Sequence, residues 1–353
     1  MLLTGKIKKN IKITTPKGVD FNAQLVDIVR NEKWVSCAVI KDGGDDPDVT
    51  TGCHIVAKVS FCEDVYSEAV VRICGGEGVG IVTKPGLDQK VGEAAINSVP
   101  RLMIEKEVLQ VCEVCDYRGG LNVVISVPEG CELAEKTFNP RLGIKNGISI
   151  LGTSGIVEPM SSQALLDTIR IELNQKHEMG CKIAVVSPGN YGLDFIKNKF
   201  NFNLNATVKC SNFIGDSLQM AVDLGFEKYL LIGHIGKLIK LSGGIMNTHS
   251  KIADCRMELL VAAGLEVGVK TEILKKILSS ISTEDGCKII KEAGKELFDK
   301  TMQIIMNKIL FYLNKKAENR IKIECMFFSN QLGLLAKSSG FEGFLEEARL
   351  QGD

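Results

Sequence analysis

The stretch CKIAVVSPGN, Cys181–Asn190, decides the fold class of the second half of the chain. It joins an apolar run of strand length to a turn that contains Pro and Gly, and KYLLIGHIG, Lys228–Gly236, repeats this pattern. Segments with helical periodicity accompany these strands at residues 163–177 and 213–225. Strands that alternate with helices are typical of right-handed βαβ units around a mostly parallel sheet.

The same alternation sets the limits that we predict for this domain. GISILGTSG, Gly147–Gly155, is interpreted as its first strand. Helical patterns run from about residue 250 to residue 316, and RIKIECMFFS, Arg320–Ser329, has the character of a late strand that returns to the sheet. The sequence therefore predicts a Rossmann-like α/β domain over residues 147–353, with a mostly parallel sheet.

Residues 1–146 have a different pattern. Apolar and polar residues alternate with period two in several short segments, among them KWVSCAVIK at residues 33–41 and HIVAKVSF at residues 54–61. This alternation is typical of half-buried strands. One helix is predicted at Val99–Val114, and the strand LNVVISV follows it at residues 121–127. We therefore predict an α+β first domain, in a chain whose overall fold class is α/β.

The composition is that of an ordinary globular protein. The chain has 353 residues, of which 45% are hydrophobic and 24% charged, and Lys+Arg and Asp+Glu each total 43. Without a net basic charge, nucleic acid is not an expected partner. No apolar run approaches the roughly 18 residues of a membrane span, and the start has no signal-peptide character. A cytoplasmic protein that does not bind membranes is predicted, and its oligomeric state is left open.

The twelve cysteines lie mainly inside apolar stretches and form no regular framework. This distribution favours free, buried thiols in a reducing compartment. Cys112 and Cys115 form a single CxxC pair without a second pair, and their spacing also fits one face of a helix. No metal site of the protein's own is predicted.

Three glycine-containing turns are predicted at the carboxyl ends of strands in the second domain. They are GTSGIV at residues 152–157, SPGNYG at residues 187–192 and GHIGK at residues 233–237. Ligands of open α/β sheets bind at this edge. None of the turns matches G-x-x-x-x-G-K-[ST] or completes G-x-G-x-x-G, so a nucleotide-like ligand is favoured without the usual NAD or ATP site. The alternative is that these glycines bind no ligand and serve only tight turns and helix packing, which require the same residues.

Two loops of the first domain carry other candidate patterns. KDGGDDPDVTTG, Lys41–Gly52, holds four Asp residues, but it fails the EF-hand pattern because no Gly follows the third acidic position and no Glu closes the loop. A solvated turn stabilised by local hydrogen bonds is the alternative. In CGGEGVGIVTKPG, Cys74–Gly86, backbone N–H groups could surround an anion, or the glycines could form a tight hairpin.

Four long segments in a fixed order resemble the signature segments of one family. They read KDGGDDPDVTTG, GIVTKPGLDQKVGEAAINSVPR, LGTSGIVEPMS and GHIGKLIKLSGGIMNTHSKIAD. By these segments the chain resembles the CbiD family, the cobalt-precorrin-5B C(1)-methyltransferases of anaerobic cobalamin biosynthesis. The resemblance runs from near residue 2 through IECMFFSN near the end. Ala94 and Ser98 stand where the family more often has Pro, and Thr51 stands where it often has His.

The resemblance implies that S-adenosyl-L-methionine donates a methyl group to ring carbon C-1 of a cobalt-containing tetrapyrrole. It also implies a fold distinct from that of the other methyltransferases of the pathway. Because the sulfonium donor carries the reactivity, the protein must align the methyl group with the nucleophilic carbon and exclude water. The glycine turns then supply the predicted cofactor-binding residues, which are Gly152, Thr153, Gly155, Ser187, Gly189 and Gly233.

The acetate and propionate groups of the macrocycle require cations and hydrogen-bond donors. The predicted substrate-binding residues are Lys84, Arg101, Lys237 and Asn247. His234 and His249 are the predicted catalytic residues, because an imidazole near neutrality can take a proton or bind a carboxylate. Each of these two histidines has two alternative roles. It could be a buried structural residue at a strand end, or an axial ligand of the substrate's cobalt.

Two other functions stay open at this point. A non-catalytic tetrapyrrole-binding or carrier protein would use the same cleft without methyl transfer. A phosphoryl-transfer enzyme would use GGEGVG as a phosphate loop, with Asp45 and Asp46 near its metal. Members of the resembled family usually begin with Gly-Tyr-Thr-Thr-Gly and an alanine-rich helix, so we predict about 30 further residues before Met1, which would add an anion site at a helix N-terminus.

Overall fold

The computed structural model describes residues 1–353 except 45–47, 63–68, 138, 153–161, 204–205 and 352–353. The chain forms two compact units, Met1–Ser161 and Ser162–Asp353. We predicted an α+β domain followed by an α/β domain, and the mixed α/β fold class is confirmed.

The first unit is built on a five-stranded sheet with the order β3-β4-β5-β8-β6. Its neighbouring strands are antiparallel except for β6 and β8, which are parallel. A separate antiparallel pair is formed by β1 and β2, and a short one by β7 and β9. The strands are β1 (Asn10–Thr14), β2 (Asp20–Gln24), β3 (Val26–Arg30), β4 (Trp34–Ile40), β5 (His54–Phe61), β6 (Val70–Gly75), β7 (Ile81–Val82), β8 (Gly120–Ser126) and β9 (Ile144–Lys145).

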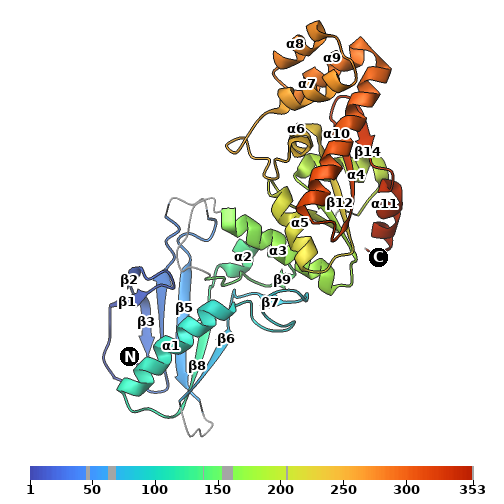
Figure 1. The fold of residues 1–353 in the computed structure, drawn as a ribbon. Coiled ribbons are helices and arrows are strands. Elements are labelled where there is room, and N and C mark those ends of the chain that lie inside the picture. The colour runs from blue at the N-terminus through green and yellow to red at the C-terminus, as the bar shows by residue number, and fades with distance from the viewer. Residues whose placement is uncertain (45–47, 63–68, 138, 153–161, 204–205, 352–353) are drawn as a thin grey trace. The chain divides into compact units, whose positions relative to one another are not determined.

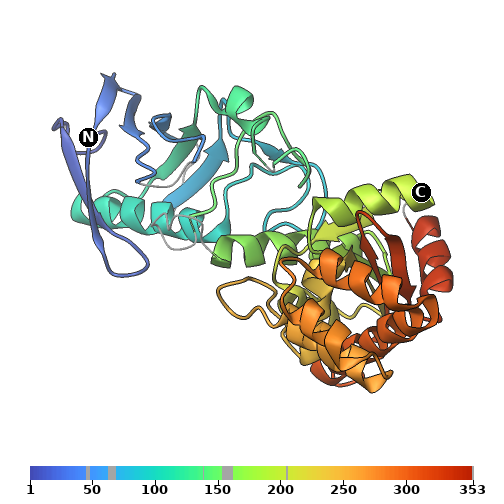
Figure 2. The same cartoon turned by 90° about the horizontal axis from the view of Figure 1, so that it is seen from above.

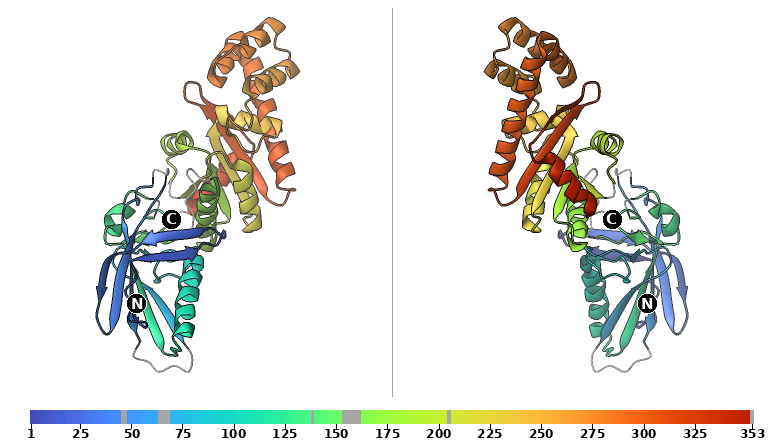
Figure 3. Two further views of the ribbon diagram at one scale, coloured as in Figure 1. Left: turned by 90° about the vertical axis from the view of Figure 1, so that its left-hand side faces the viewer. Right: turned by 90° about the vertical axis from the view of Figure 1, so that its right-hand side faces the viewer.

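Helix α1 (Ser98–Val114) lies beside this sheet (Figure 3), and its bounds confirm the helix predicted at Val99–Val114. Ile104 and Val108, one turn apart on α1, pack against a core that includes Val123 and Ile125 of β8. The short helix α2 (Gly130–Ala134) adds Ala134 to the same core. The strand predicted at residues 121–127 corresponds to β8.

Glycines of the stretch Cys74–Gly86 allow close contact between backbones in the first unit. Gly78 has φ +70°, and a Cβ atom there would lie 1.7 Å from the carbonyl oxygen of Val127. The N–H groups of Gly76 and Gly80 donate to the carbonyls of Ile125 and Ile148, at 2.8 and 2.9 Å. Because these two donors are already bound to backbone, they are not available to the anion that a phosphate loop at GGEGVG would bind.

Residues 147–150 belong to the first unit and do not begin the second. Ile148 donates to Gly78 at 3.0 Å, and Ile150 donates to Ala95 at 2.8 Å, so both are tied to the 78–97 region. They form isolated parallel bridges with Val79 and Ile96 rather than a strand of the second sheet. The division of the chain into two compact units therefore falls between residues 161 and 162, and not after Asn146 as the change of pattern predicted.

The second unit contains a five-stranded sheet with the order β11-β10-β12-β13-β14. Figure 1 labels β12 and β14 of this sheet. All neighbouring strands are parallel except β13 and β14, in agreement with the predicted mostly parallel sheet. The late strand predicted at Arg320–Ser329 is β13. The strands are β10 (Ile183–Ser187), β11 (Thr207–Lys209), β12 (Lys228–His234), β13 (Lys322–Ser329) and β14 (Gly333–Lys337).

Helices cover both faces of this sheet. Leu231 of β12 and Phe327 of β13 face a core shared with α3 (Ser162–Glu178), α5 (Ile214–Asp223) and α10 (Lys295–Lys316). Their strand neighbours Leu230 and Phe328 face a second core shared with α4 (Asn190–Phe200) and α11 (Phe341–Leu350). Successive residues point to opposite faces of a strand, so an unbroken apolar strand fits a sheet that is buried on both sides.

The remaining helices form a layer of their own. Helices α7 (Arg256–Glu266), α8 (Thr271–Leu278) and α9 (Thr283–Ala293) pack on one another, and α7 and α9 also pack on α10 (Figure 2). A short helix α6 (Ile235–Leu238) and the 3-10 helix η2 (Ile239–Gly243) follow β12 directly. In the described part of the chain, no helix is both long and apolar enough to cross a membrane.

All twelve cysteines are free thiols, and five of them are buried. Burial raises the pKa of the Cys210 and Cys287 thiols to about 12. A thiol with such a pKa stays protonated at neutral pH, so these two side chains act as small apolar residues of the core.

Candidate functional site

A cavity of about 330 Å³ lies at the carboxyl ends of β10 and β12. Its walls come from the turn after β10 (Pro188, Gly189), Gly192 at the start of α4, the end of β12 (residues 233–234), α6 (residues 236–237), the start of α9 (residues 282–284) and Arg256. From β10 the chain passes to β11 on one side, and the next strand, β12, lies on the other side of β10. The cavity is therefore at the topological switch point, where ligands of open α/β sheets bind.

The glycines of the cavity wall have different physical roles. A Cβ atom at Gly192 would lie 2.1 Å from Ser187 Oγ, and one at Gly233 would lie 2.4 Å from Leu238 Cδ1. These two positions require Gly because protein atoms pack against them. A Cβ atom at Gly189 would meet no atom of the described part of the protein within 4 Å. Of the predicted cofactor-binding glycines that line the cavity, Gly189 is thus the one that borders open space.

Two polar side chains hold the turn after β10. Ser187 is fully buried, and its hydroxyl donates to the carbonyl of Gly189 at 3.2 Å. Lys237 donates from Nζ to the carbonyl of Pro188 at 3.0 Å, which ties α6 to the turn after β10. Burial lowers the pKa of Lys237. Ser187 supports the wall of the cavity from behind, whereas Lys237 is part of that wall.

Both ring nitrogens of His234 have hydrogen-bond partners. Nδ1 accepts from the backbone N–H of Gly236 at 3.1 Å, so His234 caps the N-terminus of α6. A nitrogen that accepts carries no proton, so the neutral ring is protonated on Nε2. Nε2 lies 3.2 Å from Oε1 of Glu284 and donates to it. In this geometry His234 has no free nitrogen with which to take a proton from a substrate.

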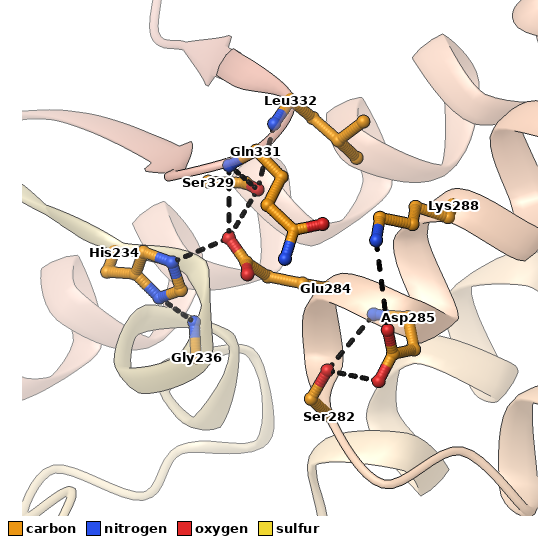
Figure 4. Close-up of polar contacts among 9 residues, drawn as sticks. All are labelled: His234, Gly236, Ser282, Glu284, Asp285, Lys288, Ser329, Gln331 and Leu332. Carbon is orange, nitrogen blue, oxygen red and sulfur yellow. Dashed lines mark hydrogen bonds and ion pairs between the residues drawn. The ribbon is translucent and has the colours of Figure 1, made fainter.

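Glu284, at the start of α9, receives hydrogen bonds on one carboxylate oxygen (Figure 4). Its Oε1 accepts from Ser329 Oγ at 2.6 Å, from His234 Nε2 at 3.2 Å and from the Gln331 N–H at 3.4 Å. Burial by itself would raise the pKa of Glu284, but the hydrogen bonds from Ser329, His234 and Gln331 outweigh it, and the pKa lies below its ordinary value. Glu284 is therefore a carboxylate at neutral pH.

The N-terminus of α9 forms the adjoining part of the wall. The hydroxyl of Ser282 accepts from the N–H of Asp285 at 3.2 Å and donates to the carboxylate of Asp285 at 2.6 Å. Thr283 is 3% exposed, and its Oγ1 has no hydrogen-bond partner among the described residues. A buried hydroxyl without a partner costs free energy unless something else satisfies it.

Arg256 is the second cationic residue of the cavity wall, in addition to Lys237. Its guanidinium donates to both carboxylate oxygens of Asp254, in one case at 2.9 Å. This hydrogen bonding to Asp254 raises the pKa of Arg256. Among the described residues, the wall of the cavity therefore contains one carboxylate, Glu284, and two cations.

Asn247 and His249 lie on a loop outside the set of described residues that line the cavity. The side-chain oxygen of Asn247 accepts from the His249 N–H at 3.0 Å, and His249 Nδ1 accepts from the Lys251 N–H at 3.1 Å. His249 is exposed. Buried Lys240 holds this loop, since its Nζ donates to the carbonyls of Thr248 at 3.1 Å and Ala253 at 2.7 Å.

The other predicted residues belong to the first unit. Arg101 donates to the backbone carbonyls of Ile96, Ile73 and Ala94 at 2.8, 2.9 and 3.4 Å, so its guanidinium is used inside the unit. Lys84 is exposed and donates to the Arg141 carbonyl at 3.3 Å.

The first glycine turn also lies in the first unit. Gly152 has φ +56°, and a Cβ atom there would lie 3.3 Å from atoms of Pro100. Thr153 and Gly155 lie outside the described residues. Gly152 therefore belongs to the first unit, and the described residues 147–152 supply no strand to the second sheet.

The acidic loop after β4 is organised by local bonds. Lys41 Nζ donates to the carboxylate of Asp48 and the hydroxyl of Thr50. Asp48 Oδ1 accepts from the N–H and hydroxyl of Thr50 at 2.8 and 2.7 Å. These contacts are those of a turn in which side chains bond local backbone. Asp45 and Asp46 lie outside the described residues.

The sequence analysis missed Glu284, Thr283, Arg256 and Ser329. Ser282-Thr-Glu-Asp285 has the pattern of a capping box, which marks the start of a helix but does not indicate which sheet edge the helix faces. Ser329 ends an apolar strand, and the rule that placed the glycine turns at strand ends would have found it too.

Comparison with known proteins gives a consistent picture. A model of the family CbiD matches residues 1–159, and a model described as CbiD, C-terminal domain, matches residues 247–339. A cobalt-precorrin-5B C(1)-methyltransferase from Ruminiclostridium cellulolyticum is 46% identical over 94% of this chain and 84% of its own. One from Alkaliphilus metalliredigens is 43% identical over 100% of this chain and 91% of its own.

Among solved structures, the chain is similar to a crystal structure of the cobalamin biosynthesis protein (cbiD) from Archaeoglobus fulgidus. The identity is 25%, the TM-score is 0.34, and the match covers 73% of this chain and 75% of that one. The family matches cover both ends of the chain, and the relatives at 43–46% identity span nearly all of it. The chain therefore belongs to the CbiD family.

Proposed function

We propose that the chain is a cobalt-precorrin-5B C(1)-methyltransferase of cobalamin biosynthesis, which methylates ring carbon C-1 of a cobalt-containing tetrapyrrole with S-adenosyl-L-methionine as donor. The observation that carries this proposal is the identity of 43–46%, along nearly the whole chain, to relatives that bear this name. The methyl donor binds in the cavity at the ends of β10 and β12.

The size and lining of the cavity support this assignment. Ligand pockets commonly measure about 300–1,000 Å³, and a cavity of about 330 Å³ is at the small end of that range. Such a volume suits an extended nucleoside derivative better than a tetrapyrrole with its acetate and propionate groups. The open space at Gly189 and the unpartnered Thr283 hydroxyl offer room and an unused polar group to a ligand.

The bound sulfonium donor supplies the electrophilic methyl group, and the residues of this chain supply position and charge. Lys237 of α6 binds the Pro188 carbonyl in the turn that bears Gly189, so it fixes the position of this turn in the cavity wall. The N-termini of α4 and α9, with Lys237 and Arg256, give the wall a positive potential that attracts carboxylates.

Contact with the tetrapyrrole falls to residues outside this cavity. Exposed His249 keeps its Nε2 without a partner among the described residues, whereas both nitrogens of His234 are bound. Of the two predicted catalytic histidines, His249 is therefore better able to bind a substrate carboxylate or accept a proton. Asn247 orients the His249 backbone, and Lys84 remains a candidate for the acetate and propionate groups.

Isothermal titration of the full chain with S-adenosylhomocysteine tests the donor site. We expect saturable binding, and turnover when S-adenosyl-L-methionine and cobalt-precorrin-5B are both supplied. Absence of heat at ligand concentrations far above the micromolar range would count against the methyltransferase. If the tetrapyrrole binds while neither donor nor product does, the chain is a carrier protein instead.

A further inference from the structure

One oxygen of Glu284 is unused. Every hydrogen bond that Glu284 receives from the described residues goes to Oε1, and Oε2 carries none (Figure 4). The side chain is 16% exposed and belongs to the cavity wall. A largely buried carboxylate with one oxygen fixed by Ser329 and His234 is pre-organised to accept hydrogen bonds from a ligand through the other oxygen.

Glu284 is poorly suited to act as a general base. Its hydrogen bonds hold the pKa below the ordinary value, despite the opposing effect of burial. A general base works best when its pKa lies near the operating pH, so a carboxylate with a lowered pKa is a weak proton acceptor at neutral pH. Its charge is instead available for binding throughout the neutral range.

The charges around Glu284 favour a neutral donor group over a cationic one. Glu284 is the second residue of α9, so the positive end of the helix dipole is beside it. Lys237 and Arg256 line the same cavity. Hydroxyl groups can donate to Oε2 without adding positive charge to this part of the wall.

Thr283, the residue before Glu284 in α9, has a second polar side chain and also belongs to the cavity wall. Its hydroxyl is buried, lacks a partner among the described residues and belongs to a residue of the cavity wall. A carboxylate oxygen without a partner has two lone pairs and can accept from two adjacent hydroxyl groups. In S-adenosyl-L-methionine, the ribose carries such a pair.

We propose that Glu284 binds the ribose hydroxyl groups of the methyl donor through Oε2, with the Thr283 hydroxyl beside it. His234 and Ser329 are then positioning residues, because each donates to the other oxygen of Glu284 and fixes the carboxylate. This assignment rests on the proposed function, since it takes the methyl donor as the ligand of the cavity.

The test compares two ligands in two proteins by calorimetry. The ligands are S-adenosylhomocysteine and its 2′,3′-dideoxyribose analogue, and the proteins are the unmodified chain and Glu284→Gln. A hydrogen bond to a charged group is worth enough for us to expect a loss of about 10- to 100-fold in S-adenosylhomocysteine affinity in Glu284→Gln. The affinity for the dideoxy analogue should change less than about threefold, because that ligand has no hydroxyl for Oε2.

Glu296→Gln is the matched control. Glu296 is the second residue of α10, as Glu284 is of α9, but it is exposed and pairs with Lys300 at 2.7 Å. This variant should bind both ligands as the unmodified chain does. Thr283→Val, which removes one hydroxyl at nearly constant volume, should weaken S-adenosylhomocysteine and spare the analogue in the same way, though by a smaller factor.

The outcomes separate this inference from the function on which it rests. If the unmodified chain binds neither ligand, the donor site itself is wrong. If it binds S-adenosylhomocysteine, but Glu284→Gln and Thr283→Val weaken both ligands equally or not at all, the ribose assignment is overturned. Ser329→Ala tests the positioning role. If Ser329 is purely structural, this variant should bind S-adenosylhomocysteine and the dideoxy analogue equally less tightly. If Ser329 positions Glu284, only the affinity for S-adenosylhomocysteine should fall.

Discussion

The two five-stranded sheets of this chain differ in how deeply they are buried. In β12, five consecutive residues from Tyr229 to Gly233 are buried, because helices cover both faces of the second sheet. In β5, none of the eight residues His54–Phe61 is fully buried. The cavity lies at the edge of the deeply buried sheet. A rigid, close-packed sheet is the better support for a site whose side chains must hold fixed positions.

The comparison also separates two uses of glycine. In the first unit, Gly78 lies against the backbone at Val127, and no room for a ligand remains. At the edge of the second sheet, Gly233 is likewise packed against Leu238, yet Gly189 borders open space. A glycine-rich string therefore predicts close approach of the backbone, but not whether the neighbour is protein or ligand.

The largest effect that we predict tests the difference in burial directly. Ile183 of β10 is 4% exposed and Ile55 of β5 is only partly buried, so Ile183→Ala and Ile55→Ala are a matched pair. We expect Ile183→Ala to lower the free energy of unfolding of its unit by about 2–5 kcal/mol, and Ile55→Ala to cost its unit about half as much or less. Hydrogen exchange, followed separately for peptides of the two sheets, measures both changes. Equal losses would show that the sheets do not differ in packing energy.

Particular elements show which parts of the fold and of the site could be predicted from the sequence. The α1 helix and β13 followed from local periodicity, which directly reflects burial. The boundary after Asn146 was misplaced because Ile148 and Ile150 pair with residues far back in the chain, and periodicity does not report pairing partners. Glu284 is separated from His234 by fifty positions in the sequence. The two side chains come into contact because α9 packs against the strand ends, and local sequence patterns do not indicate this packing.

A second prediction concerns the loop that carries His249. Lys240→Met removes the ammonium that binds the carbonyls of Thr248 and Ala253 in a buried setting. We expect a loss of about 1–3 kcal/mol, because buried carbonyls lose a charged donor. Amide exchange at residues 248–253 should accelerate more than exchange in β12. Unchanged exchange in the loop would mean that Lys240 does not hold it.

The two histidines provide a smaller contrast within the second unit. His234→Ala removes the cap of α6 and a donor to Glu284, so a stability loss of about 1–2 kcal/mol is expected together with weaker binding of S-adenosylhomocysteine. His249 is exposed, so His249→Ala should change stability by less than about 0.5 kcal/mol while lowering turnover. Thermal melts and steady-state kinetics on both variants measure this contrast. If His249→Ala destabilised the chain as much as His234→Ala, His249 would be a structural residue.

The smallest predicted effect is the pH dependence of stability that Glu284 contributes. Its pKa in the folded chain lies below the ordinary value of 4.5, because the hydrogen bonds from Ser329 and His234 outweigh burial. The folded chain therefore holds this proton more weakly than the unfolded chain does. The contribution is fully present above pH 4.5 and is lost as the pH falls through the lowered pKa of the folded state.

Glu284→Gln removes this titration, so the difference in melting temperature between the unmodified chain and Glu284→Gln should shrink as the pH falls below 4.5. The pKa of Glu296 is also lowered, by its hydrogen bond with Lys300, but that pair is exposed and salt screens it. At about 0.5 M salt, Glu296→Gln should therefore show no such pH dependence, whereas that of Glu284→Gln should persist because its partners are largely buried. The difference in melting temperature between the unmodified chain and Glu284→Gln could instead stay constant from neutral pH to below 4.5, or disappear in salt. Either result would mean that Ser329 and His234 do not hold an ionised Glu284.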